Sequence, residues 1–96
     1  MAAIEVVDNV KRHRYEAQVE GGSAFLDYRL AGNAIVLVHT QVPEALEGHG
    51  VGQALVRHAL DDARARGLAV VPMCPFVAAW IKRHPEYADL VQPPSR

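Results

Sequence analysis

The sequence of 96 residues predicts one α+β domain. Three observations predict this class. The first half alternates apolar and polar residues as strands do, a four-residue apolar period follows Pro43, and a short apolar run follows Gly67. The first pattern indicates an antiparallel meander of about four strands. The other two indicate a helix that lies on the sheet and a fifth strand parallel to the fourth.

The expected meander occupies the chain before Pro43. Its segments are a short strand near residues 4–7, a strand with Tyr15, Ala17 and Val19 on one face, a returning strand with Ala24, Leu26, Tyr28 and Leu30, and the strongly strand-like run 34–42. The glycine pair 21–22 and the stretch 31–33 are expected to form the turns between them.

The second half carries helical patterns. An apolar stripe that begins at Val51 and recurs every four residues predicts an amphipathic helix, and Gly67 stands where a terminal glycine ends such a helix. Residues 68–74 read as a short buried strand, so the strand, helix and strand form a right-handed crossover. A second helix is expected to begin at Pro75 and to end before Pro85.

Composition restricts the function classes. Half of the residues are hydrophobic, 22% are charged and the net charge is −1, which argues against a nucleic-acid partner. The apolar run of residues 34–38 is far shorter than the roughly 20 residues that cross a bilayer. A single cysteine, Cys74, indicates a reducing compartment, so a cytoplasmic protein is expected. We expect residues 1–92 to form the single domain and residues 93–96 to form a flexible end.

Three glycines, Gly48, Gly50 and Gly52, lie within five positions where the first helix begins. The first amides of a helix lack intrahelical acceptors and its dipole favours negative charge, so this stretch is suited to an anion such as phosphate. The loop lacks the Lys-Ser or Lys-Thr of a nucleoside-triphosphate loop, and the chain is too short for a dinucleotide-binding sheet. Glycines that only permit close packing remain the alternative.

The chain resembles the pyrophosphate-binding segment of the GNAT superfamily of N-acetyltransferases in the stretch "VPEALEGHGVGQALVRHAL". It is similar to the minimal YjdJ-like members in "HTQVPE" and "VVPMCPFVAAWIKRHPEYADLV", so the resemblance covers about residues 39–91. The resemblance implies the GNAT (acyl-CoA N-acyltransferase) fold and acetyl-CoA as co-substrate. It also implies an amine-bearing small molecule or protein as acceptor, in a monomer or a homodimer.

By position, the resemblance implies that the glycine loop holds the CoA pyrophosphate and that the end of the fourth strand pairs with the pantetheine arm. The backbone amide of Val42 is expected to polarise the thioester carbonyl. The implied cofactor-binding residues are Thr40, Gln41, Val42, Gly48, His49, Gly50, Val51, Gly52 and Gln53. Glu47 occupies a position where the family pattern has Gln or Arg, so its carboxylate is expected to point into solvent.

The expected catalytic residues are His39 and Cys74. The fourth strand carries no carboxylate, and an ordinary imidazole accepts a proton near neutral pH, so His39 is the expected base. A histidine packed on a sheet face is its alternative, and Glu44 is a weaker candidate base. Cys74 precedes Pro75 at a helix start, where the dipole favours thiolate, and three roles stay open: acyl relay, acid for the CoA thiolate, or small core residue.

The sequence predicts an acetyl-CoA-dependent N-acetyltransferase, with a non-catalytic CoA or acetyl-CoA sensor or accessory module as the alternative. The tail motif "RHPEY" is expected to be structural, with the Tyr87 ring on the sheet edge. A role for Tyr87 or His84 in protonating the thiolate is the alternative. Histidine spacings predict no metal site.

Overall fold

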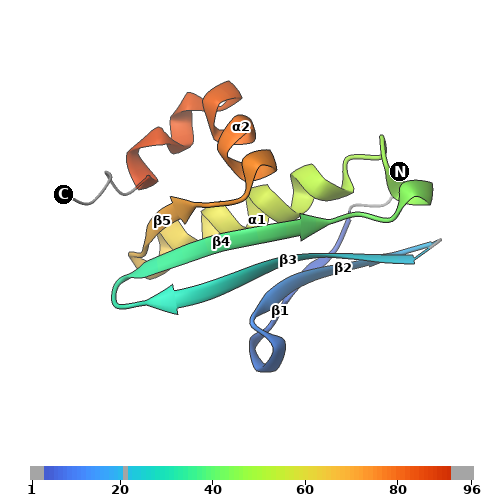
Figure 1. Cartoon of the computed structure of the whole chain (residues 1–96), viewed down its shortest axis with the longest axis horizontal. Helices are drawn as coiled ribbons and strands as arrows, with labels where there is room; N and C mark the ends of the chain where they lie inside the picture. The colour runs from blue at the N-terminus through green and yellow to red at the C-terminus, as the bar shows by residue number, and fades with distance from the viewer. Residues whose placement is uncertain (1–3, 21, 92–96) are drawn as a thin grey trace.

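The computed structural model describes residues 4–20 and 22–91 and has the α+β architecture that the sequence predicts. Five strands form one sheet in the order β1-β2-β3-β4-β5, antiparallel from β1 to β4 and parallel between β4 and β5 (Figure 1). The strands are β1 (Val6–Asn9), β2 (Arg14–Val19), β3 (Gly22–Ala31), β4 (Ala34–Gln41) and β5 (Ala69–Pro72). The expected flexible end, residues 93–96, lies outside the described residues.

The helices follow the predicted boundaries. They are α1 (Val51–Arg66) and α2 (Pro75–Arg83), with short 3-10 turns η1 (Val10–Arg12), η2 (Glu44–Leu46) and η3 (Pro85–Leu90). Gly50 and Gly67 flank α1 in the left-handed conformation, which a glycine adopts without steric cost. Within the described ranges, no helix is both long and apolar enough to cross a bilayer.

The core lies between α1 and one face of the sheet. Tyr15, Ala17, Leu26 and Leu37 are fully buried strand residues, and the apolar stripe of α1 packs against this cluster. Trp80 of α2 is fully buried in the same core. The opposite face, called the outer face below, carries exposed or half-buried residues: Arg14, Glu16, Asp27, Arg29, His39 and Gln41.

Strand β5 is shorter than the predicted residues 68–74, because the chain turns away at Pro72. The Met73 amide donates to the Val71 carbonyl at 3.1 Å, which closes a tight turn centred on Pro72. The Cys74 amide then donates to the Leu37 carbonyl at 3.0 Å, and Pro75 begins α2. Strand β4 continues to Gln41, so its last residues extend past the end of β5.

A β-bulge interrupts the pairing of β3 with β4. Tyr28 pairs with Leu37 but Asp27 pairs with His39, so Val38 is an extra residue on β4. Directly paired residues of antiparallel strands share a face of the sheet. The bulge therefore places His39 on the outer face beside Asp27.

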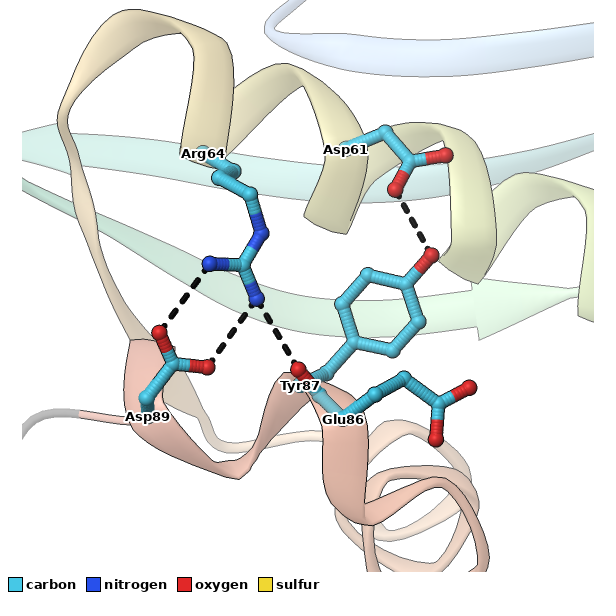
Figure 2. A network of polar contacts seen from close by, with 5 residues as sticks. All are labelled: Asp61, Arg64, Glu86, Tyr87 and Asp89. Atoms are coloured by element: carbon cyan, nitrogen blue, oxygen red, sulfur yellow. Dashed lines mark hydrogen bonds and ion pairs between the residues drawn. The ribbon is translucent and has the colours of Figure 1, made fainter.

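The segment η3 is held on α1 by polar contacts. The Arg64 guanidinium donates to both carboxylate oxygens of Asp89 and to the Glu86 carbonyl, each at 3.0 Å (Figure 2). The Tyr87 hydroxyl donates to Asp61 at 2.6 Å. The expectation that the Tyr87 ring covers the sheet edge is therefore wrong: the ring packs beside Trp80, with centroids 5.5 Å apart, because Asp61 of α1 accepts its hydroxyl.

Replacing Tyr87 by Phe tests this attachment. The ring contact with Trp80 stays and the hydrogen bond to a carboxylate is lost, so Tyr87→Phe is expected to lower the free energy of unfolding by about 1–2 kcal/mol. Chemical denaturation measures this change. Glu86→Gln is the control, because the Glu86 side chain points away from the network in Figure 2. Equal stability of Tyr87→Phe and the wild type would contradict the assignment.

Candidate functional site

A groove of about 540 Å³ lies between the end of β4 and the starts of α1 and α2. All the sequence-predicted cofactor-binding residues except His49 line it, together with His39, Leu46, Glu47 and Phe76. Its lining includes the part of β4 that extends past β5. This end of β4 lies near the loop before α1 (Figure 1). The fold therefore gathers two separate sequence segments, 39–42 and 46–53, on one surface.

The three clustered glycines have two different physical roles. Gly48 and Gly50 have φ values of 84° and 80°, a region that side chains with a Cβ rarely adopt, and a Cβ there would meet open space. A Cβ on Gly52 would lie 3.1 Å from Cζ of Phe76 and 3.5 Å from Cγ2 of Val42. The close-packing alternative thus holds for Gly52, whereas Gly48 and Gly50 shape the backbone beside the groove.

The start of α1 supplies backbone donors to the groove. The Ala54 amide donates to the Gly50 carbonyl at 3.0 Å, so the amides of Val51, Gly52 and Gln53 precede the first helical hydrogen bond. The helix dipole adds partial positive charge at the same place. These three residues line the groove, which makes this end of it suited to an anion.

His49 and Glu44 differ from the other predicted site residues. The His49 amide donates to the Leu46 carbonyl at 3.3 Å, and its exposed side chain is not part of the groove lining. Glu44 is an exposed residue of η2 and also lies outside the lining. The cofactor-binding role of His49 and the base role of Glu44 stay predictions, and the geometry of the groove does not support them.

Glu47 is exposed, as predicted, and also lines the groove. Its carboxylate adds negative charge close to the donors at the start of α1. An anion bound there experiences repulsion from Glu47, which solvent and salt reduce because the side chain is exposed. The charge of this end of the groove is therefore a balance between the helix start and one carboxylate.

The end of β4 presents its side chains to two different faces. His39 pairs with Asp27 on the outer face, where its ring meets Phe25 edge-on at a centroid distance of 6.4 Å. Thr40 pairs with the buried Leu26 and therefore points to the core side. Both residues line the groove, so a molecule lying along the strand edge has His39 on one side and Thr40 on the other.

Cys74 lies behind Thr40, at the N-cap of α2. Its Sγ is 3.4 Å from Oγ1 of Thr40, and the residue is only 4% exposed. Burial raises the pKa of the Cys74 thiol. Hydrogen bonds with the Thr40 hydroxyl and with the backbone of Val77 and Phe76 at the helix start lower this pKa by more than burial raises it, so the pKa lies below its ordinary value. Thr40 lines the groove and Cys74 does not, so the thiol contacts a lining residue without being part of the lining itself.

His84 and Tyr87 lie away from the groove lining. Nδ1 of His84 is 2.8 Å from the Trp80 carbonyl, and its ring stacks on Trp80 at 3.7 Å. His84 and Tyr87 both pack against Trp80, which agrees with the structural role that the sequence predicts for the tail motif. Within the part of the chain that the structure describes, no cluster of three or more His, Cys, Asp or Glu residues is arranged to hold a metal ion.

The sequence reasoning missed three residues around the site. Phe76 and Leu46 form apolar parts of the groove, and Asp27 is the strand partner of His39. An exposed aromatic residue in the first turn of a helix, as at Phe76, is a signal that the sequence offers. Asp27 carries no comparable signal, because its position opposite His39 depends on the bulge.

Comparison with known proteins agrees with this geometry. A family model described as GCN5-related N-acetyl-transferase matches residues 14–90. The chain belongs to the GCN5-related N-acetyltransferase family. It is 32% identical to protein NATD1 of Gallus gallus over 95 residues, covering 94% of this chain and 86% of the relative. It is 30% identical to NATD1 of Homo sapiens, covering 94% of this chain and 84% of that relative.

The fold of this family member also matches a solved structure. The solution NMR structure of a GCN5-like protein from Staphylococcus aureus superposes with a TM-score of 0.74 at 24% identity. The match covers 100% of this chain and 95% of that one. The GNAT fold expected from the sequence is therefore confirmed.

The contact between Gly52 and Phe76 generates a prediction for this family member. In Gly52→Ala the new Cβ would lie 3.1 Å from the Phe76 ring, so the ring must shift within the groove. Alanine favours a helix by up to about 1 kcal/mol over glycine, which offsets the crowding in the folded state. We expect stability close to that of the wild type and weaker binding in the groove, measured by thermal unfolding and by calorimetry with CoA. A large loss of stability with unchanged binding would contradict this.

Proposed function

We propose that this protein is an N-acetyltransferase that uses acetyl-CoA to acetylate an amine. The observation that supports this most strongly is that the start of α1, which is suited to an anion, and the open edge of β4 line one and the same groove. Membership in the GCN5-related N-acetyltransferase family supports the same reaction class.

The residues of the groove fit acetyl-CoA. The amides of Val51, Gly52 and Gln53 would hold the pyrophosphate, and the open space beside Gly48 and Gly50 lets it approach. The backbone of residues 40–42 would pair with the amides of the pantetheine arm as an added strand does. Leu46, Val42 and Phe76 would contact its apolar parts.

When bound, acetyl-CoA supplies the acetyl group: a bond forms between the acceptor nitrogen and the carbonyl carbon, the C–S bond breaks, and CoA leaves as its thiol. His39 accepts the proton that the attacking nitrogen loses, since its ring lies on the outer face beside the strand edge. The backbone amide of Val42 donates to the carbonyl oxygen as negative charge develops there.

Cys74 supplies the proton that the departing sulfur needs, through the Thr40 hydroxyl. The 3.4 Å contact joins Sγ of Cys74 to Oγ1 of Thr40, and Thr40 lines the groove. A thiol whose pKa lies below the ordinary value is a stronger acid than the thiol that leaves, so this transfer is favourable. Cys74 then takes a proton from water, and His39 releases one. Of the roles left open by the sequence, burial behind Thr40 favours the acid over the acyl relay.

Binding and transfer are tested separately. Calorimetry with acetyl-CoA measures binding, and thiol release in the presence of a panel of amines measures transfer. We expect both, and we expect Glu47→Gln to strengthen acetyl-CoA binding by about threefold at low salt and by less at high salt, because an exposed repulsion is removed. Binding without release with any amine would support the sensor alternative, and absence of binding would contradict the proposal.

The acid role predicts the effect of Thr40→Val. The Thr40 hydroxyl is the largest contribution that lowers the Cys74 pKa, so its removal raises that pKa and moves formation of the thiolate to higher pH. Ultraviolet absorbance of the thiolate as a function of pH measures the shift. We expect kcat to fall by about 100-fold with little change in the KM for acetyl-CoA.

Thr40→Ser is the matched control, because it keeps the hydroxyl and is expected to restore both the pH profile and kcat. Mass spectrometry after mixing with acetyl-CoA alone detects the competing relay. An acetyl group found on Cys74, together with kinetics in which CoA leaves before the amine binds, would replace the acid role by the relay.

A further inference from the structure

A second hollow of about 580 Å³ opens beside β3, and it adjoins the groove at the bulge of β4. Its lining includes Arg12 and His13 from the η1 turn, Asp27 and Arg29 from β3, and Val38 from β4. We call this hollow the basin. The basin is distinct from the groove, since the two share no lining residue.

The basin and the groove meet at the proposed reaction centre. Val38 lines the basin, and the next residue, His39, lines the groove. Asp27 lines the basin and is the strand partner of His39 on the outer face. A molecule in the basin can therefore present a reactive group to His39 without crossing the sheet.

The basin has positive and negative residues at different positions. Arg12 and Arg29 are exposed, and neither guanidinium forms an ion pair with another described residue. Asp27 supplies the negative charge, and it lies on the His39 side of the basin. Asp27 and Arg29 are two positions apart on the same face of β3, which corresponds to about 7 Å along the strand.

The η1 turn holds two of these residues in a defined conformation. The Asn9 side chain accepts a hydrogen bond from the Arg12 amide at 3.2 Å. His13 has a φ of 56°, which is uncommon for a residue other than glycine, and its carbonyl accepts from the Tyr28 amide at 2.9 Å. The turn thus presents Arg12 and His13 to the basin from a fixed backbone.

We propose that the acetyl acceptor is a small amine that also carries an anionic group, either a carboxylate or a phosphate, and that it binds in the basin. Its ammonium group lies toward Asp27 and His39, and its anionic group lies toward Arg12 and Arg29. The short separation of Asp27 and Arg29 suits a compact molecule with both charges. This inference rests on the acetyltransferase function proposed above and names the class of its second substrate.

Matched acceptors test the proposal with the full chain and acetyl-CoA. Phosphoethanolamine is compared with ethanolamine, and glycine with glycinamide, so that the two pairs separate phosphate from carboxylate. We expect at least one anionic acceptor to exceed its neutral partner by about tenfold or more in kcat/KM. Arg29→Gln and Arg12→Gln are expected to bring this ratio close to one, whereas the exposed Arg83→Gln of α2 keeps it.

If the wild type transfers acetyl groups with kcat/KM ratios near one for both pairs of acceptors, the acetyltransferase function stands but the proposed class of acceptor is overturned. Faster acetylation of uncharged peptide amines than of either anionic acceptor would overturn it as well. If acetyl-CoA does not bind, the proposed function fails, and the basin is judged by amide shifts of the isotope-labelled protein. Shifts at His13 and Arg29 with phosphoethanolamine or glycine, but not with their neutral partners, support the site, and their absence overturns it.

Discussion

The turn at Pro72 is the constraint on which the site depends. Proline has no amide hydrogen and a fixed φ, so it ends the ladder between β5 and β4 and suits the tight turn that the Met73 amide closes. If β5 continued in register, its backbone would occupy the edge of β4 beyond Leu37 and fill the position of the groove. The early departure of β5 leaves polar backbone groups of β4 facing a groove, which is the chemical requirement for pairing with an extended amide-containing arm.

The close approach of α2 to α1 depends on a second small feature. Gly52 lies in the first turn of α1, and the absence of a Cβ lets the Phe76 ring lie against the helix. The ring then forms a wall of the groove while Cys74, two residues earlier, stays buried behind Thr40. The start of α2 therefore contributes an apolar surface to the groove and an acidic thiol behind it, both fixed by the Pro75 that begins the helix.

Most of the fold could be predicted because local patterns determine it. The alternation in β2 and β3, the apolar stripe of α1, Gly67 and Pro75 each indicate an element or a boundary through a short-range physical effect. The groove was predictable for the same reason, since the glycines and the helix start are neighbours in sequence. Asp27 was not predictable: counting back through the hairpin from the pair Ala31 and Ala34 would place it opposite Val38, and only the bulge brings it opposite His39.

The position of the Tyr87 side chain was not predictable either. Its hydrogen-bond partner Asp61 lies in a different element, and no spacing rule connects the two residues.

The division of β4 into two faces explains how so short a chain can serve the proposed reaction. Consecutive strand residues point to opposite faces, so His39, the proposed proton acceptor, and Thr40, the proposed proton relay, lie on either side of one edge. An acceptor must then reach that edge from the outer face, where His39 and Asp27 lie. A helix packed over the outer face would bury Val38 and the other exposed residues and add stability, but it would also close this approach. The exposure of this face therefore keeps open the approach that the proposed reaction requires.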